Sequence, residues 1–167
     1  MALTKVRGSG ISNMVISDAG IITKPLQPAF FVTPSTGQTN FAADDSAVTV
    51  VFGTEVFDHG GNFASNTFTA PVGGKYQFNV SVCLLNIDTA ASNYQVYLVT
   101  SNRTYGFLLD PDGYDADVPF WTFTTSVLAD MDAADTATVA VSQNGGTAQT
   151  DIEASGLRTH FSGYLVA

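Results

Sequence analysis

The sequence predicts an all-β domain, a sandwich or jelly roll of about eight to ten short strands. The clearest sign is the segment 75–85, where every second side chain is apolar: Tyr76, Phe78, Val80, Val82 and Leu84. A strand has a side-chain period of two, so this segment has one buried face and one polar face. Short apolar runs also recur between Gly- and Pro-containing turns, and no window of a dozen residues keeps a helical period.

The first half of the domain is expected to form short strands. Residues 29–33 (AFFVT) follow Pro28 and are apolar and β-branched, and residues 47–52 and 55–57 carry Val and Phe on either side of Gly53. Residues 58–62 (DHGGN) have the composition of a turn. A short strand at 67–70 then leads through Pro-Val-Gly-Gly into the alternating segment.

In the second half, a strand is expected at 93–101, followed by a long loop at about 109–119. Strands at 120–128 and 136–142 flank an acidic turn at 130–135. The Asn-Gly-Gly of residues 144–146 begins a longer loop, and residues 158–166 are expected to form the final strand.

The length of 167 residues fits one domain preceded by a distinct segment. Residues 1–27 are rich in Gly and Ser and hold three of the six basic residues. We interpret residues 1–27 as an extended arm, with a short strand near Met14–Ile16, and residues 28–167 as the head domain.

A net charge of −9 excludes several function classes. Nucleic acids and anionic membranes both require clustered Lys and Arg, whereas the six basic residues here are scattered. No apolar run is long enough for a secretion signal or a membrane span, so we expect neither export by such a signal nor membrane insertion. The single cysteine, Cys83, excludes an internal disulfide.

Several strands are apolar on both faces, which predicts self-association. Phe120–Phe123 (FWTF), residues 30–32 (FFV) and the final strand all show this pattern. A sheet that is apolar on both sides is covered on both sides, and a second subunit is the expected cover. We therefore expect the alternating strand at 75–85, with its polar face, in an outer sheet, and the doubly apolar strands in the subunit interface.

Six segments together resemble the globular head of complement C1q and the wider tumour-necrosis-factor-like superfamily. They occur in the family's order: PAFFV at 28–32, FDHGGNF at 57–63, FTAPVGGKYQFNV at 68–80, YQVYLV at 94–99, LADMDAADTATVAV at 128–141 and FSGYLV at 161–166. The sequence departs from the family at DAADTATV, where a Gly usually precedes the Asp, so the turn at Ala134–Asp135 is expected to differ.

The resemblance implies a ten-stranded jelly roll that forms a compact homotrimer with its chain termini near the base. The sheet carrying the first and last strands would form the trimer core. By this resemblance the residues expected in the interface are Phe31, Trp121, Phe161 and Leu165.

The arm also resembles the lead-ins of bacteriophage fibre and virion-associated proteins, particularly those of marine phages. The resemblance implies a non-enzymatic virion protein, a fibre tip or surface knob, assembled in the host cytoplasm and used for host attachment or particle decoration. Its arm would bind other virion proteins, and its head a host-surface glycan or protein. The alternatives are a structural capsid or tail component that binds no receptor, and a tail-associated glycan hydrolase.

One acidic loop and two tyrosines are candidate ligand sites. Four carboxylates surround a Gly in the loop and could supply oxygen ligands for calcium: Asp110, Asp112, Asp115 and Asp117. The alternative is a solvated acidic loop, because the spacing is not that of an EF-hand. Tyr105 and Tyr114 lie in or near this loop and are the candidates for stacking on a sugar. No motif for catalysis is present, so we expect no catalytic residues.

Overall fold

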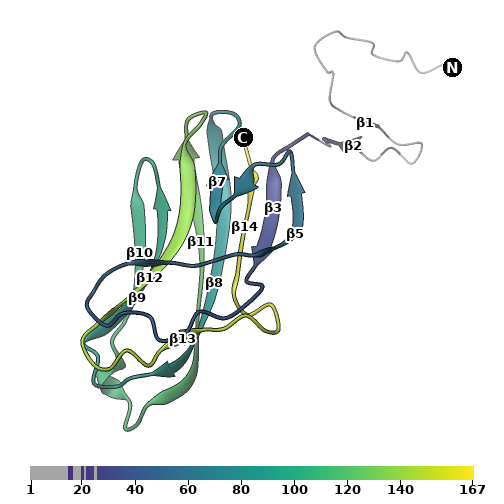
Figure 1. Cartoon of the computed structure of the whole chain (residues 1–167). Helices are drawn as coiled ribbons and strands as arrows, with labels where there is room; N and C mark the ends of the chain where they lie inside the picture. Colours follow the sequence, from purple (N-terminus) through teal and green to yellow (C-terminus); the bar gives the residue numbers. More distant parts are fainter. Residues whose placement is uncertain (1–14, 17–19, 21, 25) are drawn as a thin grey trace, which may run out of the picture.

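The chain folds as a sandwich of two antiparallel β-sheets, as the sequence predicts (Figure 1). The structure is a computed structural model that describes residues 15–16, 20, 22–24 and 26–167. In this part of the chain the only helical element is the 3₁₀ turn η1 (Pro111–Gly113), and no helix there could cross a membrane. Most of the predicted arm lies outside the described residues. Within it, β1 (Val15–Ile16) pairs with β2 (Ile22–Thr23).

We call the first sheet the β14 sheet, and its strand order is β11–β8–β14–β3–β5. Its strands are β11 (Val118–Met131), β8 (Gly74–Ile87), β14 (His160–Leu165), β3 (Ala29–Thr33) and β5 (Thr54–His59), and the short β13 (Asp151–Ile152) also pairs with β8. All these pairs are antiparallel.

The second sheet, here the β12 sheet, has the order β10–β9–β12–β7–β6, and β4 also pairs with β12. Its strands are β10 (Thr104–Leu109), β9 (Asn93–Thr100), β12 (Thr136–Asn144), β7 (Thr67–Thr69), β6 (Phe63–Ala64) and β4 (Val48–Thr49).

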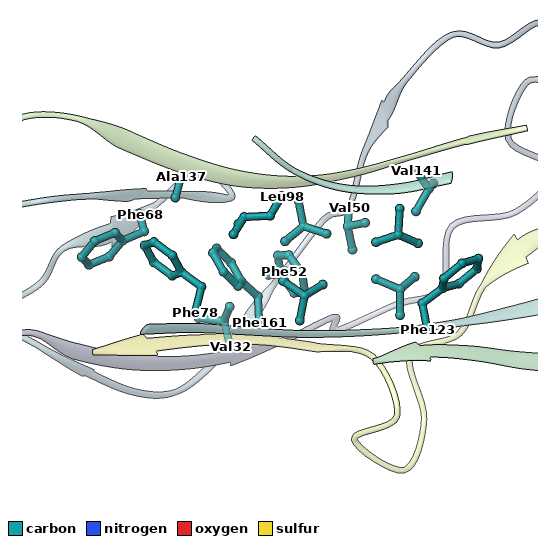
Figure 2. Packing of buried hydrophobic residues seen from close by; sticks show 14 of the residues in the cluster. Val32, Val50, Phe52, Phe68, Phe78, Leu98, Phe123, Ala137, Val141 and Phe161 are labelled. Atoms are coloured by element: carbon teal, nitrogen blue, oxygen red, sulfur yellow. The ribbon is translucent and has the colours of Figure 1, made fainter. Parts of the chain in front are cut away.

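The core lies between the two sheets and is rich in phenylalanine. Figure 2 shows side chains from both layers filling the space between them. The alternating residues of β8 that we expected to be buried are all buried here: Tyr76, Phe78, Val80, Val82 and Leu84. Phe30 lies at the centre of an aromatic cluster, stacked on Phe68 at 4.8 Å between ring centroids and edge-on to Phe161 at 4.9 Å.

This cluster explains the glycine of the FSGYLV segment. Gly163 pairs with both Phe30 and Phe78 across the sheet. A Cβ atom at Gly163 would lie 2.6 Å from Cδ1 of Phe78 and 2.8 Å from Cε1 of Phe30. The two rings occupy the space of a side chain, so only glycine fits at this position.

Two predictions about the strands are wrong. The predicted strands include none between 101 and 109, yet β10 forms there because Tyr105, Phe107 and Leu109 alternate and pack against the core. We also expected the alternating strand in an outer sheet, whereas β8 lies between β11 and β14, in the sheet of the first and last strands. The polar face of β8 therefore belongs to the sheet that we expected to be doubly apolar.

The chain enters and leaves the sandwich at the same end. The amide of Leu165 donates to the carbonyl of Pro28 (3.0 Å), and Lys75 N–H donates to the carbonyl of Ala167 (2.6 Å). These contacts lie at the start of β8, whose fourteen residues run to the opposite end. At about 3.3 Å per residue, Gly74 and Asn86 are roughly 40 Å apart. Figure 1 accordingly shows the C-terminus at the opposite end of the sandwich from β13.

Candidate functional site

The side of the β14 sheet that faces away from the core carries two adjacent rows of uncharged side chains. Residues paired across antiparallel strands point to the same side, so the strand register defines rows across the sheet. One row consists of Phe57, Phe31, Ser162, Asn79 and Ser126. The adjacent row consists of His59, Ala29, Tyr164, Gln77 and Leu128. We call these two rows the outward face, and neither contains Asp, Glu, Lys or Arg.

The middle of the outward face is polar and internally hydrogen-bonded. The Gln77 amide donates to Ser126 Oγ (2.7 Å), and the Ser126 hydroxyl donates to Asn79 Oδ1 (2.9 Å). The same Gln77 amide also lies 3.1 Å from the carbonyl of Val127. These side chains hydrogen-bond to one another within the subunit. They would keep these hydrogen bonds if a second subunit covered the face and excluded water.

Apolar side chains beside this polar centre are open to solvent. Phe57 and Tyr164 are 43% and 46% exposed, Leu128 is 57% exposed, and Phe120, further along β11, is 63% exposed. Phe31 is half-buried, and its ring is stacked on the His160 imidazole. Exposed apolar side chains gathered on one sheet face indicate an interaction surface.

The four predicted interface residues do not share this surface. Phe31 lies on the outward face. Phe161 lies on the core side of β14 and is fully buried within the subunit, and Leu165 lies on that side as well. Trp121 pairs with Leu84 and packs against the core, edge-on to Tyr114 at 5.7 Å. The final strand has apolar residues in both phases, so the sequence alone could not assign its faces.

Phe57 and Leu128 are surface residues that are not among the predicted interface residues. For Leu128 a signal exists, because β11 alternates from Phe120 through Thr122, Thr124 and Ser126 to Leu128. All five of these residues are exposed, so this phase of the strand faces outward. Phe57 follows a bulge in β5, between the residues paired with Phe31 and Val32, which shifts the strand's phase and hides the pattern.

The acidic loop does not bring its carboxylates together. Asp110 caps η1 by accepting from the N–H of Asp112 (3.0 Å). Asp117 lies at the start of β11 and accepts from Thr89 N–H and from the Gln149 amide (3.0 and 2.8 Å). These bonds, with that from the Thr89 hydroxyl, lower the pKa of the Asp117 carboxyl. No group of three or more His, Cys, Asp or Glu side chains placed for a metal occurs in the described residues. Calcium binding stays a prediction that this arrangement does not support.

The two tyrosines proposed for sugar stacking lie in different environments. Tyr105 belongs to β10 and packs against the core, so its ring is not a free platform. Tyr114 follows η1 directly and is partly exposed, with its ring against Trp121. Of the two tyrosines, only Tyr114 lies in a loop.

Cys83 lies beneath the segment that precedes β14. Its N–H donates to Thr159 Oγ1 (3.1 Å), and Glu153 N–H donates to its carbonyl (2.9 Å). Burial raises the pKa of the Cys83 thiol, so the sulfur is a protonated, buried group and not an accessible nucleophile. Above it, Arg158 forms an ion pair with Glu153, which holds the pKa of that carboxyl below its ordinary value.

Comparison with known proteins identifies the family. The model of the C1q domain matches residues 29–166 of this chain. The chain belongs to the C1q domain family. A search of curated proteins finds no match. Domains of the C1q and tumour-necrosis-factor-like group are typically non-enzymatic, and they typically form trimers.

Solved structures agree with the C1q assignment at the level of the fold. The globular domain of zebrafish complement 1qA is 15% identical with a TM-score of 0.58, and the match covers 84% of this chain and 98% of that one. Murine APRIL, in a crystal structure at pH 8.5, is 10% identical with a TM-score of 0.59, covering 84% and 99%. At these identities the likeness concerns the jelly-roll fold alone.

Proposed function

We propose that this C1q domain is the trimeric head of a phage virion protein, a fibre tip or surface knob that attaches the particle to its host. The observation that carries the trimer is the outward face of the β14 sheet. It combines exposed Phe57, Tyr164 and Leu128 with an internally satisfied polar centre. Packing these faces together removes apolar surface from water. Each Å² buried in this way stabilises the assembly by about 25 cal/mol.

The charge distribution is compatible with self-association through this face. The chain carries a net charge of −9, so three copies repel one another wherever carboxylates approach. The two rows of the outward face contain no acidic residue, so contact there brings no like charges into direct opposition. Trimeric assembly typical of the family supports the same conclusion.

The position of the chain ends supports a role as a presented knob. Residues 1–27, the proposed virion-docking arm, lead into β3 at the end where β14 also finishes. An arm attached at that end leaves the opposite end, near Asn86 and β13, pointing away from the particle. The phage setting itself is supported by the resemblance of residues 1–27 to the lead-ins of phage fibre proteins.

Light scattering followed by cell binding tests the proposal. We expect a mass of about 53 kDa, three times 17.6 kDa, for the full chain. We also expect fluorescently labelled trimer to bind intact marine bacteria saturably, in competition with unlabelled protein. A monomer would overturn the proposal. A trimer that labels none of a broad panel of strains would instead support a structural virion component without receptor binding.

A further inference from the structure

A polar hollow lies at the end of the sandwich remote from both chain ends. Its volume is about 460 Å³, within the range of small-molecule sites. It is formed by segments that are far apart in the sequence, and its lining residues are Asn40, Asn86, Asp117, Val118, Pro119 and Gln149. They come from the loop after β3, the end of β8, the start of β11 and the loop before β13.

Two asparagine side chains line this hollow without a hydrogen-bond partner in the described part of the chain. The backbone around Asn40 is fixed, because its N–H donates to Asp151 Oδ1 (2.8 Å). Asn86 ends the regular part of β8, and its carbonyl accepts from Thr150 Oγ1 (3.2 Å). Both residues have left-handed backbone conformations, with φ of 50° and 55°. Their backbones are thus held, while their amide groups remain available to a ligand.

Asp117 and Gln149 form a second, preorganised pair in the same hollow. The Gln149 amide donates to Asp117 Oδ2 (2.8 Å), while Thr89 holds the other carboxylate oxygen from two directions. The lowered pKa of Asp117 keeps its carboxylate ionised and able to accept further hydrogen bonds. The hollow therefore presents fixed acceptors beside free amide donors.

The lining residues restrict the class of ligand. None of them is Lys or Arg, and one is an ionised carboxylate, so an anionic ligand is repelled. Val118 and Pro119 are the only apolar residues of the lining, and the hollow is largely open to solvent, so it does not enclose a hydrophobic ligand. Asp117 is the one carboxylate among the lining residues, which provides too few charged oxygen ligands for a divalent cation.

A sugar hydroxyl is both a donor and an acceptor, and an amide side chain offers both complements. We propose that this hollow binds a neutral saccharide through Asn40, Asn86 and Asp117, an inference that rests on the proposed attachment function. Its location fits, because it lies roughly 40 Å along β8 from the arm and therefore at the end that faces away from the particle.

Saturation-transfer NMR on the full chain tests this proposal. The probes are glucose, galactose, mannose, N-acetylglucosamine, maltose and lactose, each at high millimolar concentration. The test variant is Asn40→Gly with Asn86→Gly, since glycine accepts the left-handed backbone of both positions. The matched control is Ser65→Gly, a left-handed position in the turn between β6 and β7, outside the hollow.

We expect at least one probe to show saturation transfer with the wild type and with Ser65→Gly, and at least tenfold weaker binding to the double variant. No transfer with any probe, or transfer that the double variant retains, would overturn the proposal. Circular dichroism confirms that the double variant is folded. If the double variant still labels bacterial cells as a trimer, host attachment stands and only the assignment of the hollow fails.

Discussion

The ring of Phe31 lies almost parallel to the imidazole of His160, with ring centroids 5.1 Å apart and an angle of 18° between planes. The two residues belong to neighbouring strands, β3 and β14, and pack on the side of the sheet that faces away from the core. Phe57 extends this aromatic group at 6.3 Å from Phe31. Packing within one subunit therefore already holds the Phe31 ring, so ordering this side chain costs little entropy on association.

Leu128 tests the assembly of this face directly. We expect Leu128→Glu to shift the mass of the protein from about 53 kDa to 17.6 kDa, because it places like charges in the subunit contact. Light scattering at fixed concentration measures the effect. Leu108→Glu is the control, because Leu108 is similarly exposed but belongs to β10 in the β12 sheet. A Leu128→Glu protein that stays trimeric, or an equal effect of both variants, contradicts the proposed interface.

Gly163→Ala tests the close packing of the core. The new methyl group would meet Phe78 and Phe30 at 2.6 and 2.8 Å, so both rings must shift. We expect the free energy of unfolding to fall by about 1–3 kcal/mol, measured by urea denaturation. Gly113→Ala serves as the control, because a Cβ atom there meets nothing within 4 Å. Equal stability of the two variants would show that the aromatic cluster is loosely packed.

Ala134 occupies a backbone conformation that favours glycine. Its φ is +74°, in the turn where the family usually carries a Gly before the Asp and where this sequence has DAAD. The left-handed region costs an L-residue about 1–2 kcal/mol, partly offset in glycine by its greater freedom when unfolded. We expect Ala134→Gly to raise the free energy of unfolding by up to about 1 kcal/mol.

The midpoint of urea denaturation at equal protein concentration checks this gain. Ala133→Gly is the control: its position is also exposed but does not have a positive φ, so we expect a neutral or destabilising effect. If Ala134→Gly lowers the free energy of unfolding, the methyl group of Ala134 stabilises the fold by more than its left-handed backbone conformation costs.

The ion pair of Glu153 and Arg158 gives a pH-dependent contribution to stability. Arg158, Ser155 and a weaker interaction with Cys83 lower the pKa of Glu153 in the folded state. A lowered folded pKa means that the contribution is present above the ordinary pKa of about 4.5 and is lost as the pH falls through the folded value. We therefore expect Glu153→Gln to be less stable than the wild type at neutral pH, with the difference shrinking below pH about 4.5.

Thermal melting across this range, at low and high salt, measures the difference. High salt should weaken the contribution, because Arg158 is half exposed. The control is Glu55→Gln on the edge strand β5, where the carboxylate has no hydrogen-bond partner in the described residues. A constant gap between the wild type and Glu153→Gln down to acid pH would contradict the assignment.

The alternation from Tyr76 to Leu84 predicted which side of β8 is buried, because a half-buried strand enforces a period of two on its sequence. It could not predict the sheet to which β8 belongs. Ser81 and Cys83, in the polar phase, are buried under Thr159 and the residues before it, a long-range contact that leaves no mark on the local pattern. The same limit affected Phe161, since β14 is apolar in both phases and only pairing with β3 and β8 fixes its faces.

The hollow shows why sites are harder to predict than strands. In the sequence Asp117 stands out only as part of an acidic run, whereas its partners are Thr89 and Gln149, from other loops. Asn40 and Asn86 carry no local signal beyond the tolerance of asparagine for left-handed backbone. These residues meet because loops from distant parts of the sequence converge at one end of the sandwich.

The shared entry and exit of the chain has a mechanical consequence. A pull between the arm at Pro28 and a ligand at the opposite end runs along the strands, since β8 spans the whole distance. The hydrogen bonds joining β3 to β14 and β14 to β8 then carry the load together in shear, and they do not open one at a time. The proposed attachment role would thus load the pairing of β14 with both of its neighbours along the direction of the strands.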